Sequence, residues 1–127
     1  MSPTTADRTG TLPALDTGCL ADLAHRLGDV GPARETVLVF LHGVDAHHTE
    51  LVDAVLAADL AVVRRVAHRL ASVSALLGAR DLHNLSSHLE VSALLGDLDD
   101  VTELRPAFEV ALDQAAEALR EWLAAAA

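Results

Sequence analysis

Lysine and tyrosine are absent from this sequence of 127 residues, and cysteine and tryptophan each occur once. The single cysteine, Cys19, excludes an intrachain disulfide and a multi-cysteine zinc site. With two phenylalanines and one tryptophan as its only aromatics, the chain must build its core from Ala, Leu and Val, which dominate a hydrophobic fraction of 51%. Such aliphatic cores favour packed helices over a β-sandwich, and the length fits one domain.

Positive charge is also scarce. All 9 basic residues are arginines, and 19 acidic residues bring the formal net charge to −10. Binding to nucleic-acid phosphates depends on clustered basic residues, so we expect no nucleic-acid partner. The longest strongly apolar run, residues 37–41, is too short to span a bilayer, and the N-terminal residues lack the apolar segment of a secretory signal. We therefore expect a cytoplasmic protein that does not associate with membranes.

Turn-forming residues divide the chain into a tail and about six helical segments. Residues 1–14 are rich in Thr, Pro and Gly without periodicity and are predicted to be disordered, whereas residues 15–124 are predicted to form the helical domain. Separate helices are predicted before and after Gly43, the first opened by Pro32 and the second capped by Asp45. The fold prediction is all-α, an antiparallel four-helix bundle of the longer helices with the first one or two covering one end.

Capping residues predict where individual helices begin and end. The first helix is predicted to begin at residue 16 or 17 and to end at Gly28. Asp59 is predicted to cap a helix that Gly78 terminates. In the last helix Pro106 removes a backbone hydrogen bond, which predicts a kink or restart in the turn before it.

The helix predicted after Asp59 carries one histidine at the centre of its polar face. At 100° per residue His68 points almost directly away from an apolar stripe formed by Val63, Val66, Leu70, Val73 and Leu77. Small side chains around it would let another protein approach the imidazole closely. Helical spacing alone leaves open that His68 is a surface histidine without a role. The residues predicted to surround it are Ala61, Arg64, Arg65, Ala71, Ser72 and Ala75.

Other chemistry finds little support in the sequence. His47 and His48 are adjacent and diverge by about 100° on a helix, and His83 and His88 have poor spacing for chelation, so we expect no metal site. The chain has no Gly-x-Ser-x-Gly motif and no glycine-rich phosphate loop. A catalytic domain with its own nucleotide site is therefore not expected.

The segment around His68 resembles the signature of histidine phosphotransfer (HPt) domains, Ala-His-x-Leu-Lys-Gly-Ser-x-x-x-Leu-Gly-Ala. Two of the departures from it lie next to the histidine on the chain, where Ala71 stands in place of the lysine and Ser72 in place of the first glycine. The resemblance continues into the next predicted helix, where the family tends to repeat leucines and close with Leu-Glu, and it reaches upstream to Asp59. The matching residues are Ala67, His68, Leu70, Leu77, Gly78, Ala79, Leu82, Leu85, Leu89 and Glu90.

The resemblance implies that His68 accepts a phosphoryl group from a receiver-domain aspartate in a two-component phosphorelay and passes it on. The protein would then be a phosphocarrier and not an enzyme, its partners a receiver domain or a hybrid histidine kinase, and magnesium would be held by the receiver, so that this chain needs no cofactor. Residues expected to dock the partner or lie near the phosphate are Arg64, Arg65, Ala71, Ser72 and Ala75.

The two departures leave other functions open. A lysine at position 71 would lean back over His68. Its absence is compatible with a protein that binds receivers without efficient transfer, a pseudo-HPt regulator. A helical interaction module unconnected with phosphorelays is a third alternative.

Overall fold

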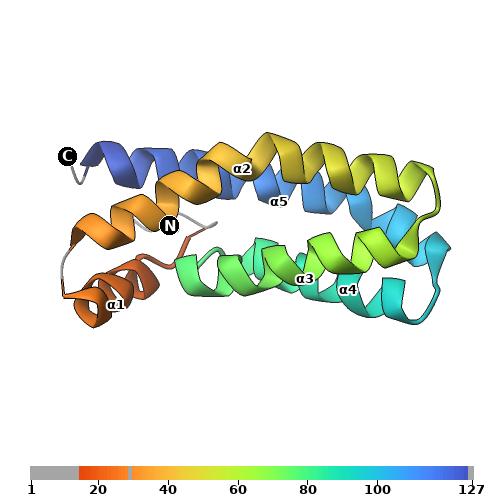
Figure 1. The fold of residues 1–127 in the computed structure, drawn as a ribbon, viewed down its shortest axis with the longest axis horizontal. Helices are drawn as coiled ribbons and strands as arrows, with labels where there is room; N and C mark the ends of the chain where they lie inside the picture. The colour runs from red at the N-terminus through yellow and green to blue at the C-terminus, as the bar shows by residue number, and fades with distance from the viewer. Residues whose placement is uncertain (1–14, 29, 126–127) are drawn as a thin grey trace, which may run out of the picture.

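The computed structural model describes residues 15–28 and 30–125, and every regular element in these ranges is helical. The predicted N-terminal tail, residues 1–14, lies outside the described residues. Four long helices run antiparallel side by side, and the short α1 lies next to the ends of α3 and α4, beneath the longer α2 and α5 (Figure 1). The all-α bundle with an additional N-terminal helix is thus confirmed. The helices are α1 (Thr17–Leu27), α2 (Val30–Leu56), α3 (Leu60–Leu77), α4 (Arg80–Leu94) and α5 (Leu98–Ala125).

The core of the bundle is aliphatic, as the composition predicts. Leu, Val and Ala account for nearly all of it, joined by Phe40 and Phe108. Full burial of a Leu or Phe side chain contributes about 1.5–3 kcal/mol to stability, so the interior of the bundle supplies the main favourable term for folding. The largest fully buried side chains include Phe108, Leu20, Leu51, Leu70, Leu77, Leu82, Leu89, Leu112 and Leu119.

The ends of α3 are defined by the residues that the sequence indicates. Asp59 is the N-cap, and its Oδ1 accepts a hydrogen bond of 3.3 Å from the Val62 amide. Gly78 ends the helix in the left-handed conformation, with φ +80°. A Cβ at Gly78 would lie 2.3 Å from the Asp16 carbonyl oxygen, and the Asp16 amide donates to the Gly78 carbonyl at 2.6 Å. The beginning of α1 is therefore packed directly against the turn between α3 and α4.

The prediction of two helices around Gly43 is wrong, because α2 is continuous from Val30 to Leu56. Asp45, the predicted cap, is an exposed residue inside this helix. A glycine within a helix costs about 1 kcal/mol relative to alanine. Buried residues on both sides, among them Val37, Val44 and Leu51, outweigh that cost by packing one face of the helix into the core.

Helix α5 also continues through a residue that was expected to interrupt it. Pro106 lies inside α5, so the predicted restart is wrong. Both Pro106 and Thr102, whose carbonyl loses its usual helical donor, are exposed, so water can satisfy that carbonyl. A bend in this turn stays a prediction. None of the described helices is both long and apolar enough to cross a bilayer.

Candidate functional site

His68 lies near the middle of α3 with its imidazole in solvent. The side chain is 67% exposed, and its Nδ1 lies 2.7 Å from Oε2 of Glu90 on α4. An ionised carboxylate only accepts hydrogen bonds, so Nδ1 carries the hydrogen and donates it. The lone pair is then on Nε2, at the outer tip of the ring. Glu90 thereby fixes both the tautomer and the orientation of the histidine, and leaves one nitrogen available to a reacting partner.

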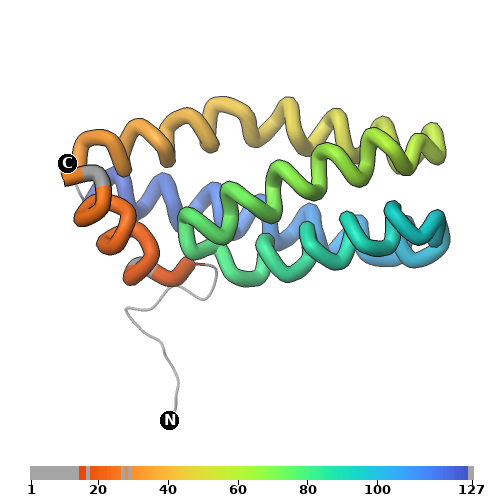
Figure 2. Tube along the Cα trace, turned by 60° about the horizontal axis from the view of Figure 1, so that its bottom comes forward, coloured from red at the N-terminus to blue at the C-terminus, as the bar shows by residue number. Residues whose placement is uncertain are grey.

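The contact between His68 and Glu90 depends on how closely α3 and α4 pack. These two helices lie side by side (Figure 2) and pack against each other more extensively than any other pair of described helices. His83 of α4 adds a second tie, because its Nδ1 donates to the Ala71 carbonyl at 2.8 Å. Small buried residues on both helices permit this approach. They are Ala67, Ala71 and Ser74 on α3, and Ser86 and Ala93 on α4.

The placement of Ala71 corrects the sequence analysis. We expected Ala71 on the exposed surface around the imidazole, but it is only 6% exposed and lies against α4. The helical wheel places it about 60° from His68, and α4 lies close enough to α3 to cover that angle. Ser72 and Ala75 are exposed, as expected. The Ser72 hydroxyl donates to the His68 carbonyl at 3.1 Å, so it is engaged by its own helix.

The arginines near the imidazole differ in what they contact. Arg65 is paired with Glu50 of α2 at 2.8 Å. Arg64 and Arg69 are exposed, and within the described part of the chain neither forms a hydrogen bond or ion pair. Arg69 instead lies beside His47, whose pKa is lowered first by burial and then by that guanidinium. Arg64, one turn before His68, therefore lies near the imidazole without a carboxylate partner among the described residues.

Other histidines tie helices together. His48 Nε2 lies 2.5 Å from Glu109 on α5, and His88 Nε2 lies 3.1 Å from Asp100 at the start of the same helix. Across the described residues, no three side chains of His, Cys, Asp or Glu are arranged to hold a metal ion. These pairs cross from one helix to the next and brace the bundle.

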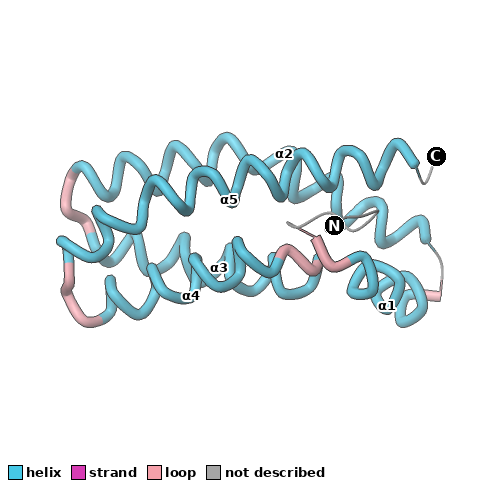
Figure 3. Tube along the Cα trace, turned by 180° about the vertical axis from the view of Figure 1, so that it is seen from behind, coloured by secondary structure: helices cyan, strands magenta, loops and turns pink. Residues whose placement is uncertain are grey.

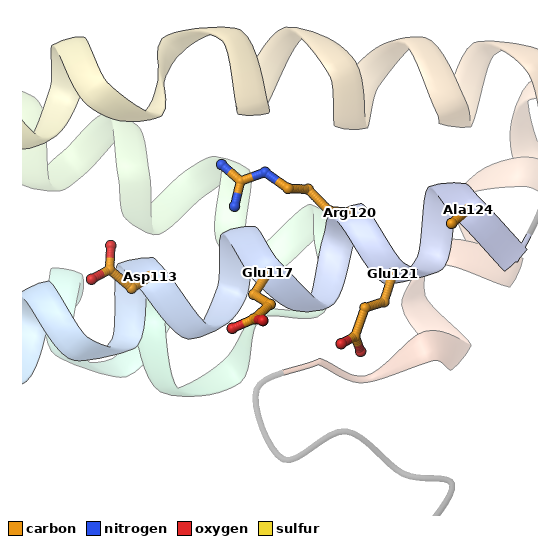
Figure 4. Close-up of a pocket in the computed structure, with 5 residues that line it drawn as sticks. All are labelled: Asp113, Glu117, Arg120, Glu121 and Ala124. Atoms are coloured by element: carbon orange, nitrogen blue, oxygen red, sulfur yellow. The ribbon is translucent and has the colours of Figure 1, made fainter.

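A shallow hollow on α5 gathers carboxylates but has no connection with His68. Asp113, Glu117 and Glu121 line it, with Arg120 directed to the opposite side from the two glutamates (Figure 4). Seen from behind, α5 lies diagonally across the bundle from α3 (Figure 3). The hollow therefore belongs to another face of the protein.

Sequence reasoning missed the role of Glu90, although it included the residue in the resemblance. A signal was present, because His68 and Glu90 are equally far along the chain from Ala79, the residue at the turn between α3 and α4. In an antiparallel helical hairpin, residues equidistant from the turn lie at the same level. That symmetry brings the carboxylate to the imidazole.

Comparisons with known proteins agree with this geometry. The sequence profile described as Hpt domain matches residues 35–122. The fold is similar to the crystal structure of histidine-containing phosphotransfer protein B (HptB) from Pseudomonas aeruginosa PAO1, with a TM-score of 0.80 and 23% sequence identity. The aligned region covers 89% of this chain and 96% of that one. No protein in the curated set matched the sequence.

Proposed function

The chain belongs to the Hpt domain family of histidine phosphotransfer proteins, and on that premise we propose that it carries phosphoryl groups in a two-component phosphorelay on Nε2 of His68. One observation supports this assignment above the others. The imidazole is exposed, and Glu90 holds its Nδ1–H so that Nε2 presents its lone pair to solvent. Among the described histidines paired with a carboxylate, His48 and His88 use Nε2, whereas His68 uses Nδ1 and so keeps Nε2 for a partner.

The transfer step uses this lone pair. Nε2 of His68 attacks the phosphorus of a receiver's aspartyl phosphate in line with the leaving oxygen, so the N–P bond forms as the P–O bond to the aspartate breaks and frees its carboxylate. The ring gains positive charge as the bond forms. Glu90, 2.7 Å from Nδ1, stabilises that charge. In the reverse direction the protonated ring is the leaving group, and Nδ1 keeps its proton throughout.

Charge on the transferring group also needs neutralisation. Magnesium on the receiver would neutralise most of this charge, and we assign no metal to this chain. Arg64 can help, because it lies one turn before His68 on the same exposed face, but its side chain leans toward the N-terminus and so away from the imidazole. Arg65 contributes less, since Glu50 already holds its guanidinium.

A second candidate function has support from two residues. Ala71, where the family has lysine, is buried, and the Ser72 hydroxyl is bound to the helix backbone. Ala71 has no donor, and the Ser72 hydroxyl donates to the His68 carbonyl in this structure. A protein that docks receivers without efficient transfer would have this arrangement.

The test is direct phosphorylation. Receiver domains encoded in the same genome are phosphorylated with acetyl phosphate, mixed with this protein, and the products are separated and treated with acid and alkali. We expect an acid-labile, alkali-stable phosphate on this chain that His68→Gln abolishes and His88→Gln, a matched change of another exposed histidine, leaves intact. Label that persists in His68→Gln would exclude the site. Receiver binding without label would select the second function.

A further inference from the structure

Helices α2 and α3 diverge from their shared turn toward α1 (Figure 2), and a groove opens between them. Its volume of about 560 Å³ lies within the range of small-molecule sites in proteins. The groove is lined mainly by apolar side chains, among them the buried Phe40 and the half-buried Val73, and Val39, 74% exposed, stands at its rim. It therefore presents apolar surface to solvent beside a few polar groups.

Arg69 and His47 mark one end of this groove. They are equally far along the chain from Ala58 in the turn between α2 and α3, so they lie at the same level of the antiparallel pair. Arg69 is exposed, and among residues 15–28 and 30–125 it has no hydrogen bond or ion pair. Burial and then this guanidinium lower the pKa of His47, so its ring is neutral at pH 7, and Glu50, which also acts on the ring, is paired with Arg65. Arg69 is thus the charge that this end of the groove offers.

A glycine in α2 accommodates the imidazole of His47. A Cβ at Gly43 would lie 3.2 Å from Nε2 of His47, close enough that the ring would have to shift. The ring therefore rests against the helix at the glycine and lines the groove without filling it. This contact gives a reason for a glycine inside a long helix, where it is less favourable than alanine.

The far end of the groove carries the opposite charge. Glu35 lines it there, about 18 Å along α2 from His47 at the rise of an ideal helix. The Thr36 hydroxyl donates to the Pro32 carbonyl at 2.9 Å, so it is already engaged. Between the two ends, about 10 Å of apolar lining separates His47 from Phe40. A ligand with one acidic group can place that group at Arg69, whereas a second one at the far end would meet Glu35.

We propose that this groove binds an amphipathic carboxylate, a small molecule with one acidic head group that pairs with Arg69 and an apolar body that lies against Phe40 and Val73. Arginine binds carboxylates through two parallel hydrogen bonds, which sets the direction of the ligand. Each methylene group removed from water tightens binding by up to about fourfold. The proposal does not rest on the function proposed for His68, from which Arg69 points about 100° away around α3.

The experiment titrates the full chain with simple amphipathic probes. Decanoate is the main probe, used below the concentration at which it forms micelles. Octanoate tests the contribution of the apolar body, and octanol, which lacks the charge, tests that of the head group. The variants are Arg69→Gln and Val39→Ser in the groove, with Arg120→Gln and Val110→Ser on α5 as matched exposed controls. Circular dichroism verifies that helix content is unchanged in each.

We expect calorimetry to show saturable binding of decanoate at one site, with weaker binding of octanoate and weaker still of octanol. Arg69→Gln should weaken decanoate binding about fivefold, as the loss of one exposed charge pair does. Val39→Ser should also weaken it, and both controls should bind as wild type. In NMR spectra decanoate should shift the ring signals of His47 and not those of His88. Equal affinity for octanoate and octanol, or an equal loss in Arg120→Gln and Arg69→Gln, overturns the proposal.

A second set of measurements separates the groove from the phosphorylation site. His68→Gln should bind decanoate as the wild type does. Phosphoramidate, a small P–N phosphodonor, should label His68 at the same rate with and without decanoate. Slower labelling would place the ligand over His68 and overturn its assignment to this groove. If phosphoramidate labels no histidine at all, the proposed function fails, while the decanoate titration still decides the groove.

Discussion

Replacement of Glu90 tests the central physical argument, that a carboxylate from α4 prepares His68 for transfer. Glu90→Gln keeps an oxygen that can accept the Nδ1 hydrogen but removes the negative charge. Glu90→Ala removes both. If the carboxylate acts as described, the first change should slow the reaction and the second should also release the tautomer.

The magnitude follows from the exposure of the two side chains. A hydrogen bond to a charged group contributes about 1.5–3 kcal/mol. Glu90 is 30% exposed and His68 67%, so solvent screens the pair and we take about 1 kcal/mol. At RT of about 0.6 kcal/mol, Glu90→Gln should slow phosphorylation by phosphoramidate about fivefold. Glu90→Ala should slow it more, since the ring then also loses its fixed orientation.

The assay pairs labelling kinetics with nitrogen NMR of the histidine. In the wild type the spectrum should show the hydrogen of His68 on Nδ1, and Glu90→Gln should preserve this, whereas Glu90→Ala should not. Glu109→Gln is the matched control, because Glu109 contacts His48 through a comparable pair on another face. The reasoning is refuted if Glu90→Ala is labelled as fast as wild type, or if its tautomer is unchanged.

Three further predictions concern residues around the site and the core. Ala71→Lys should raise the transfer rate from a receiver by placing a cation near the phosphate, yet lower the free energy of unfolding by about 1–3 kcal/mol because position 71 is buried against α4; unchanged kinetics in a folded variant would contradict the first part. Burial lowers the pKa of His47 from 6.5, so the unfolded chain takes up a proton first and stability is lost as the pH falls below 6.5; urea titrations at pH 8 and pH 5 should show a smaller loss for His47→Gln. Gly78→Ala should lower the free energy of unfolding by more than the roughly 1–2 kcal/mol that a left-handed φ costs, because the new Cβ meets the Asp16 carbonyl. Gly96→Ala, with open space around the new Cβ, should lose only the contribution of φ, and equal losses of the two variants in thermal unfolding would refute the contact.

Local sequence signals predicted the ends of α1 and α3 correctly, because the predicted caps form there, whereas Asp45 does not cap a helix. Helix α3 begins after Asp59 and ends at Gly78, because a side-chain N-cap and a C-cap glycine in the left-handed conformation act within a few residues. The predicted break at Gly43 was wrong because the weakening effect of a glycine is also local and says nothing about tertiary packing. Burial of residues on both sides of it, which depends on α3 and α5, decided that α2 continues.

The features of the candidate site also separate into those set by the local sequence and those set by tertiary packing. Periodicity alone determined that His68 faces away from the core, because the apolar stripe of a helix sets which direction is inward. It could not determine what lies on either flank of the histidine, since that depends on the distance and register of neighbouring helices. The close approach of α4 decided that Ala71 is buried and that Glu90 holds Nδ1, and the position of α2 decided that Arg65 is paired while Arg64 is free. The sequence pattern of a helix determines which of its faces points inward, whereas contacts between helices form only when the whole core is packed.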